Sequence, residues 1–167
     1  MSVTPISGQL DPTVLRRAFG AFPSGVVAVA ASVDGVEIGL AASSFTSVSL
    51  EPALVSFSVA NGSATWPVLR TSPHLGLSVL ADHHDAVCRQ LAGPAKHRFE
   101  GLATTCTADG ALLLDDAVAT FECSVDQEVT AGDHTIVLLA LHAVQDPGTA
   151  LPLVFHRSAF GRLAASA

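Results

Sequence analysis

A cluster of hydroxyl side chains lies early in the chain, among apolar residues in a pattern typical of β-strands. Six serines and one threonine fall within GLAASSFTSVSLEPALVSFSV, residues 39–59; they are Ser43, Ser44, Thr46, Ser47, Ser49, Ser56 and Ser58. A hydroxyl in an apolar setting costs about 1–3 kcal/mol unless it is hydrogen-bonded. The pattern indicates a polar ligand beside these strands. A solvated strand edge is an equally good interpretation, since serine and threonine also occur in strands that bind nothing.

Residues further along the chain indicate that the ligand is an anion. Ser63 stands at the start of a predicted short helix, where unpaired backbone N–H groups favour a phosphate, and Thr65 adds a hydroxyl in the first turn. Arg98 lies beside Lys96 and Phe99 in the irregular segment KHRF. An arginine in an otherwise acidic protein is a natural partner for phosphate.

Small residues suggest that the ligand is also flat. Ala41, Ala42 and Ala60 flank the hydroxyl cluster and would let the backbone approach a ring closely. No G-x-x-x-x-G-K or G-x-G-x-x-G pattern occurs, which argues against a phosphate loop or a Rossmann domain. The residues together predict a flat aromatic ligand that carries phosphate.

Other groups capable of chemistry are expected to play no catalytic role. His83, His84 and Cys88 fall in one predicted helix, but zinc needs three or four ligands and no second cluster of matching spacing follows. We therefore expect no metal site. Cys106 and Cys123 have no neighbouring histidine or basic residue that would form a thiolate, so neither is expected to be a nucleophile.

Composition limits the classes of protein to which the chain can belong. Its 167 residues are 49% hydrophobic and 14% charged, which predicts one folded domain over residues 1–167. The main part of this domain is expected to run from about residue 11 to residue 163. The high apolar content also predicts that a second subunit covers some of the surface. The net charge of −7 and the dispersed arginines argue against nucleic acid. No apolar run is long enough to cross a membrane, and the start MSVTPISGQLDP is not expected to be a signal peptide. Three widely spaced cysteines indicate free thiols in a reducing cytoplasm.

The elements that would position these residues are mostly strands. Helices are predicted over 11–22, from Ser63 to before Pro73, and from Asp82 to Gly93, with Asp11 and Asp82 as caps. Strands are predicted at 25–33, 36–45, 51–60, 75–81, 119–129, 134–144 and 152–156, with a polar connection over 94–110. Strands joined by hairpin turns predict a closed or nearly closed antiparallel barrel with a few short helices.

Six segments occur in an order that resembles the flavin reductase-like family of FMN-binding split-barrel proteins. They are PSGVVAVAA, the hydroxyl-rich segment above, SATWPVL, HRFEG, GDHTIVLLALHAV and PLVFHRSAFGRL, and the resemblance extends in the same order from about Leu15 to Leu163. The resemblance is strongest to the short-chain reductases that supply reduced flavin to two-component monooxygenases. It implies a Greek-key split β-barrel, a homodimer, FMN or FAD as the flavin, NADH or NADPH as the hydride donor, and a monooxygenase partner that takes reduced flavin by diffusion.

The resemblance also assigns the site residue by residue. The segment Ala42–Ser47 is expected to wrap the flavin ring, and the residues that follow are expected to border the ribityl chain and phosphate. The flavin set is Ala42, Ser43, Ser44, Phe45, Thr46, Ser47, Ser58, Val59, Ala60, Ser63, Thr65, Arg98 and Phe99. His134 is expected to position the nicotinamide. The nucleotide set is His134, His156, Arg157, Phe160 and Gly161.

The chain departs from the family pattern in having no tyrosine. Phe155 and Phe160 stand where the terminal segment commonly has Tyr, so ring stacking survives but a phenol hydrogen bond does not. The rival hypothesis is a flavin-binding or haem-binding split-barrel protein without reductase activity, because a fold does not determine a function. His142 shares the strand of His134 but lies about 26 Å away at the rise of a strand, so the two cannot serve one small site.

Overall fold

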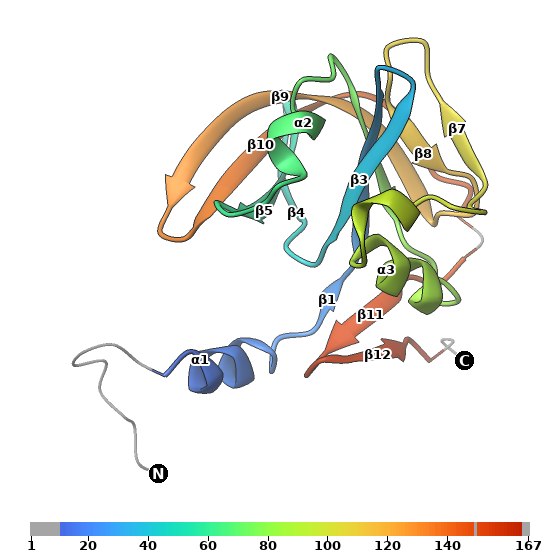
Figure 1. Ribbon diagram of the computed structural model, residues 1–167. Coiled ribbons are helices and arrows are strands. Elements are labelled where there is room, and N and C mark those ends of the chain that lie inside the picture. The colour runs from blue at the N-terminus through green and yellow to red at the C-terminus, as the bar shows by residue number, and fades with distance from the viewer. Residues whose placement is uncertain (1–10, 149, 165–167) are drawn as a thin grey trace.

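The computed structural model describes residues 11–148 and 150–164, and its architecture is mainly antiparallel β with short helices, as the sequence predicted. Seven antiparallel strands form the main sheet in the order β3-β2-β6-β9-β10-β5-β4 (Figure 1). Their bounds are β2 Val27–Val33, β3 Val36–Ala42, β4 Thr46–Leu50, β5 Ala53–Ala60, β6 Leu75–Val79, β9 Ala119–Ala131 and β10 His134–Gln145. The described residues do not include most of the N-terminal segment MSVTPISGQLDP or the two ends of the expected domain 1–167.

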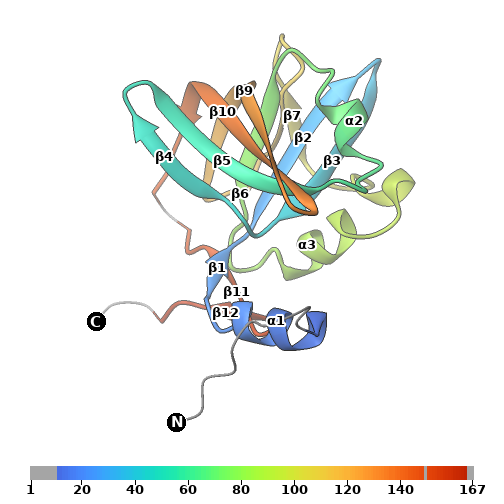
Figure 2. The ribbon, with the colours of Figure 1, turned by 90° about the vertical axis from the view of Figure 1, so that its left-hand side faces the viewer.

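Two smaller sheets and several short helices complete the fold. The three-stranded sheet has the order β1-β11-β12, and the two-stranded sheet pairs β7 with β8. Their bounds are β1 Ser24–Gly25, β11 Leu153–His156, β12 Ala159–Arg162, β7 Thr104–Cys106 and β8 Leu112–Leu114. The helices are α1 Pro12–Phe19, α2 Trp66–Leu69, α3 Asp85–Leu91 and the 3-10 turn η1 Ala95–His97. Figure 2 shows α1, β11 and β12 lying together below the main sheet. None of these helices is long and apolar enough to cross a membrane.

Strand β2 and the residue before it are buried on both faces because they separate two hydrophobic clusters. Val27, Val29 and Ala31 belong to the first cluster, with Phe57 and Leu77. The alternate residues Val26, Ala28 and Ala30 belong to the second, with Leu91 of α3 and Leu153 of β11. Successive side chains of a strand point to opposite faces, so a strand between two cores has no solvent face. This arrangement explains the uninterrupted apolar run at 26–31.

The predicted helix from Asp82 to Gly93 is shorter than expected, and Asp82 does not cap it. Helix α3 begins at Asp85, with His84 at the capping position and no side-chain cap. The backbone N–H of Asp82 donates to Leu151 O (2.8 Å), and its neighbour Ala81 forms a bridge with Pro152. Pairing with the distant segment at 151–152 keeps the chain extended here and delays the helix.

The connection expected over residues 94–110 is partly regular. It contains η1 and β7, and β7 pairs with β8, which the sequence did not predict. Strands β1 and β12 were also missed, whereas the cap of α1 is confirmed, because Thr13 N donates to Asp11 Oδ1 (2.8 Å). Strand β4, which has five residues, lies between the predicted strands at 36–45 and 51–60 and was also missed. The other missed strands have two to four residues, too few for an alternating pattern to be recognised.

Gly76 of β6 lies where the main sheet meets β8, and it provides a test of this packing. A Cβ atom at this position would overlap the carbonyl group of Leu112. We expect Gly76→Ala to lower the free energy of unfolding by at least about 2 kcal/mol, because backbone cannot move aside as a flexible side chain can. Chemical denaturation measures the change. Gly25→Ala is the matched control, since nothing lies within 4 Å of its added methyl group. Equal stability of the two variants would contradict the described packing.

Candidate functional site

The hydroxyl-rich loop between β3 and β4 is held against β5 by one of its own serines. Ser44 Oγ accepts a hydrogen bond from the N–H of Ser58 (2.8 Å) and lies 3.2 Å from Ser58 O, to which it donates. This hydroxyl is therefore used by the fold. Ser43, Thr46 and Ser47 are exposed, so their hydroxyls remain accessible to a ligand. The loop thus brings two parts of the expected flavin set together.

The side chain of Phe45, in the middle of this loop, faces the interior. It is half-buried, packs against the first hydrophobic cluster and stacks on Phe121 of β9 with ring centroids 6.3 Å apart. Anchoring the loop through its aromatic residue leaves the neighbouring polar residues on the outside. The expected contact of Phe45 with a flavin stays a prediction.

The end of β5 lies beside the turn between β9 and β10. In the register of β5 with β10, His134 is opposite Ala60 and Ile136 is opposite Ser58. The flavin segment Ser58–Ala60 and the nicotinamide residue His134 were predicted from segments more than seventy residues apart in the chain. The structure brings them to adjacent strands.

Asn61 fixes this arrangement, and the sequence analysis did not single it out. Its backbone N–H donates to Asp133 O (3.0 Å) and its amide donates to Gly132 O (3.1 Å). Its side-chain oxygen accepts from Thr135 Oγ1 (2.9 Å). Three hydrogen bonds from one residue tie the end of β5 to both sides of the turn. The Asn-Gly pair after β5 was the available signal, since such pairs mark chain turns.

His134 is an exposed histidine with a fixed orientation. Its Nδ1 lies 2.8 Å from Asp133 Oδ1, and this hydrogen bond lowers the pKa of the Asp133 carboxyl group. Because the carboxylate accepts, Nδ1 carries a proton, and Nε2 is left to face a ligand. A histidine oriented in this way can hold a hydrogen-bonding group such as a carboxamide.

The expected phosphate side of the site is built around Arg98. Its Nη1 donates to Thr65 Oγ1 (2.9 Å) and to Gly39 O (2.7 Å), and its Nε donates to Gly93 O (2.9 Å). Arg98 and Thr65 line a pocket of 310 Å³, together with Lys96, Glu37 and apolar residues that include members of β3 and α2. Since Thr65 Oγ1 accepts from Arg98, its own proton is free to donate to a ligand. The predicted pairing of Arg98 with Thr65 in one site is therefore present.

Two other members of the flavin set have structural roles. The sequence predicted Ser63 as the cap of a helix that ends before Pro73, but α2 covers only Trp66–Leu69 and has Thr65 at its capping position. Ser63 Oγ still accepts from the N–H of Trp66 (3.2 Å), the first residue of the helix. Phe99 is buried in the second hydrophobic cluster, and its ring would meet any Cβ added at Gly39. Direct contact of Ser63 or Phe99 with a flavin stays a prediction.

The nucleotide residues after His134 lie on the separate β11–β12 hairpin. Arg157 and Ser158 form its turn with positive φ angles of 49° and 63°, and Arg157 N donates to Gly20 O (3.0 Å). The ring of Phe160 lies 5.5 Å from that of Phe155 and 5.0 Å below the guanidinium of Arg89. The two aromatic rings that replace tyrosine thus pack together, and part of their surface is engaged by the protein itself.

The hairpin and the main sheet meet next to the hydroxyl-rich loop. Ser24 of β1 pairs with Phe155, and three residues later Val27 of β2 pairs with Ala42. The start of the expected flavin segment therefore lies near β11. No hydrogen bond within residues 11–148 and 150–164 joins His156 or Gly161 to His134. His134 begins β10 of the main sheet, whereas His156 and Gly161 belong to the β11–β12 hairpin.

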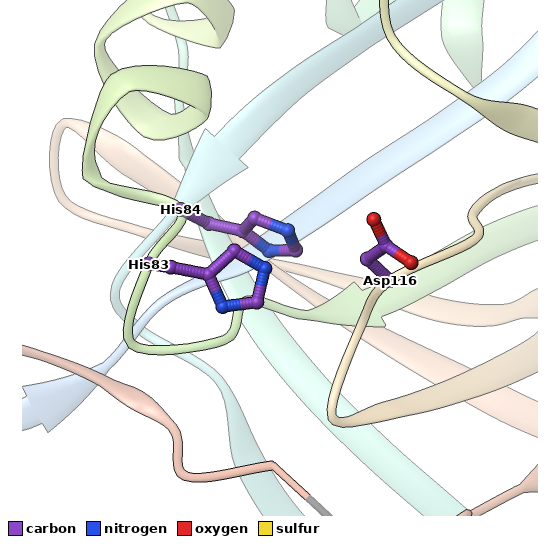
Figure 3. Close-up of side chains that lie close together, drawn as sticks. All are labelled: His83, His84 and Asp116. Atoms are coloured by element: carbon purple, nitrogen blue, oxygen red, sulfur yellow. The ribbon is translucent and has the colours of Figure 1, made fainter.

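Two histidines and an aspartate meet at the start of α3 (Figure 3). Their geometry indicates whether this cluster could bind a metal ion. The ligand atoms of His83, His84 and Asp116 lie within 4.8 Å of one another. His84 is buried, and its Nδ1 accepts a hydrogen bond from the N–H of Ala81 (3.1 Å). A neutral imidazole has only one lone pair for this purpose, so Nε2 carries the proton and has none to offer a metal. This hydrogen bond opposes metal binding at the three residues.

All three cysteines are free thiols, as predicted. Cys123 is fully buried, and burial raises its pKa to about 12. Burial also raises the pKa of Cys88. Neither buried thiol forms a thiolate near neutral pH, and this is consistent with the expectation that Cys123 is not a nucleophile.

Comparison with known proteins agrees with the geometry. Residues 19–164 match the family model described as flavin reductase like domain. The chain is 34% identical over 161 residues to a flavin reductase of Pseudomonas putida, covering 96% of this chain and 95% of the relative. It is 28% identical over 151 residues to HsaB, the reductase subunit of a flavin-dependent monooxygenase of Rhodococcus jostii, covering 90% of this chain and 77% of the relative.

A solved structure supports the same assignment. The NADH:FAD oxidoreductase SgcE6 of Streptomyces globisporus, crystallised with NAD and FAD fragments, superposes with a TM-score of 0.88 at 32% identity, covering 96% of this chain and 99% of that one. The split-barrel fold class predicted from the six segments is thereby confirmed. On the family match and these similarities, the chain belongs to the flavin reductase-like family.

Proposed function

We propose that this flavin reductase uses NADH to reduce free FMN or FAD and releases the reduced flavin to a monooxygenase component. The observation that carries the proposal is the pairing of β5 with β10. It sets His134, expected at the nicotinamide, beside Ala60, expected at the flavin. A site for hydride transfer needs both substrates within contact distance, and this register supports that requirement.

The protein contributes binding and orientation in this proposal. A bound flavin supplies the redox chemistry by accepting hydride from the nicotinamide. Arg98 and Thr65 hold its phosphate, and the exposed residues Ser43, Thr46 and Ser47 border its ring and ribityl chain. His134, oriented by Asp133, positions the nicotinamide through Nε2. No side chain has to act as an acid or base in the hydride transfer itself.

Named relatives support the choice of donor and partner. SgcE6 is described as an NADH:FAD oxidoreductase, which favours NADH for this chain, and HsaB is a reductase subunit of a monooxygenase. The hairpin residues His156, Arg157, Phe160 and Gly161 would border the nucleotide. Free thiols and the need for NADH favour the cytoplasm as the location.

We further propose that the working unit is a homodimer. Helix α1 is amphipathic, yet none of its residues is buried, and Phe19 and the following Phe22 are largely exposed. Leu50, at the β4–β5 turn, is 96% exposed. Apolar side chains in such numbers are costly in water, and a second copy of the chain would cover them.

The principal test is NADH oxidation by the purified protein under anaerobic conditions. We expect turnover only when FMN or FAD is added, because the flavin is proposed to be a substrate that leaves after reduction. NADPH in place of NADH should give a lower kcat/KM. Flavin binding without turnover by either donor would support the rival hypothesis of a flavin-binding protein without reductase activity.

Two substitutions should separate the two halves of the site, each serving as the control for the other. Thr65→Val removes the hydroxyl donor and should raise KM for flavin about three- to tenfold, the effect of losing one hydrogen bond. His134→Ala should raise KM for NADH by a similar factor and leave flavin binding unchanged. Steady-state kinetics with each substrate varied measures both. A shift of both KM values by either variant would contradict the assignment.

The homodimer is tested by light scattering after size exclusion. The wild-type protein should have about twice the chain mass of 17.1 kDa. Phe22→Asp should shift the population toward the monomer, because a charge would be buried in the interface. Val36→Asp, at the exposed first residue of β3, is the control and should remain dimeric. A monomeric wild-type protein would refute the proposal.

A further inference from the structure

Two imidazoles and two carboxylates converge at the far end of β10, away from the candidate active site. His74 precedes β6, Asp109 lies between β7 and β8, Glu122 is in β9, and His142 is in β10. The Nδ1 atom of His74 lies 2.7 Å from Glu122 Oε1 and 3.8 Å from Asp109 Oδ2. The three ligand atoms all lie within 4.8 Å of one another. Four segments of the chain thus meet at one polar cluster.

The charges of this cluster are not balanced by the protein. Two carboxylates face one imidazole nitrogen, and a single proton on Nδ1 serves Glu122 at 2.7 Å while Asp109 is left at 3.8 Å. His74 and Glu122 are both largely shielded from solvent. A divalent cation in place of the proton would neutralise both carboxylates.

The surroundings hold the cluster in shape. Thr107 Oγ1 donates to Glu122 Oε1 (2.9 Å), an outer partner of the kind that orients ligands in metal sites. The ring of His142 stacks on that of His74 at 4.6 Å and is itself bonded to Ser124 Oγ (2.8 Å). His142 falls at a register shift of β10 against β9, between Leu141 and Ala143. Such bulges redirect a side chain, and here the redirected ring supports His74.

We propose that His74, Asp109 and Glu122 bind a divalent transition-metal ion, with zinc as the best fit to one imidazole and two carboxylates. In a tetrahedral zinc site with bonds of about 2.0–2.2 Å, neighbouring ligand atoms are separated by about 3.3–3.5 Å. The observed separations of 2.7 and 3.8 Å lie on either side of that value, so small side-chain movements suffice.

The difference from the cluster at α3 lies in the hydrogen bonds of the histidines. His84 Nδ1 is an acceptor for a backbone N–H, which no ligand exchange can remove. His74 Nδ1 is a donor to Glu122, and its proton can be replaced by a metal ion while the carboxylate remains a ligand. The two clusters have similar composition, but only the second presents its nitrogen to acids alone.

The metal would act as a structural clamp rather than in hydride transfer. Ala143, which pairs with Glu122, is nine residues from His134 along β10, or about 30 Å at the rise of a strand. The site joins the segment before β6, the β7–β8 turn and β9. Metal binding should therefore raise the thermal stability of the protein and leave kcat and both KM values of the reductase unchanged. Failure of this prediction would not affect the proposed reductase function.

The test uses full-length protein stripped with a chelator and then titrated with zinc or cobalt. We expect saturable binding of one ion per chain, a rise in Tm on zinc addition, and visible cobalt bands typical of tetrahedral coordination. Asp109→Asn and Glu122→Gln should each weaken zinc binding by at least about tenfold. Both keep the size of the side chain, and Asp109 is exposed, so its variant is expected to fold normally.

His83→Ala is the matched control, because it removes an exposed histidine from the other cluster. This variant should bind zinc as tightly as the wild type. No saturable binding by the wild type, unchanged affinity in Asp109→Asn, or loss of binding in His83→Ala would each overturn the proposal.

Discussion

The pairing of β5 with β10 is the constraint on which the rest of the structure depends. Strand β10 lies between β5 and β9 in the main sheet, so its register determines which residues of three strands become neighbours. A slip of one residue would turn every side chain to the opposite face. Asn61 opposes such a slip, since its three hydrogen bonds match one register only. The proximity of His134 to Ala60 is thus a property of the sheet rather than of a flexible loop.

Arg98 couples the expected phosphate site to the integrity of the fold. Its guanidinium braces three separate elements through Gly39, Thr65 and Gly93, and a group held in this way is already oriented before a ligand arrives. The same bonds mean that replacing Arg98 would disturb packing as well as binding. Thr65 is the better probe of ligand contact for this reason, because Thr65→Val removes one of these three contacts of Arg98, whereas replacing Arg98 removes all of them.

The long strands β5, β9 and β10 could be predicted from the sequence, because each contains a long run of residues typical of strands. The family could also be predicted, because six segments resemble it in the same order. The short strands β1, β8 and β12 could not, because each has only two to four residues and depends on its pairing partner, which for β1 is the distant strand β11. Asn61 looked like an ordinary turn residue. The cluster of His74, Asp109, Glu122 and His142 has no spacing signal at all, since each member comes from a different segment brought together only by the sheet.

Three histidines differ in what each can bind, and in each case the hydrogen-bond partner of Nδ1 accounts for the difference. In His134 that atom donates to Asp133, which fixes the ring and leaves Nε2 to face a substrate. In His84 it accepts from a backbone N–H, which holds the ring neutral and, with burial lowering its pKa, excludes it from binding a metal. In His74 it faces two carboxylates that one proton cannot satisfy. Residue type alone does not assign a histidine to catalysis, structure or metal binding, because a neutral imidazole has one proton and one lone pair to distribute.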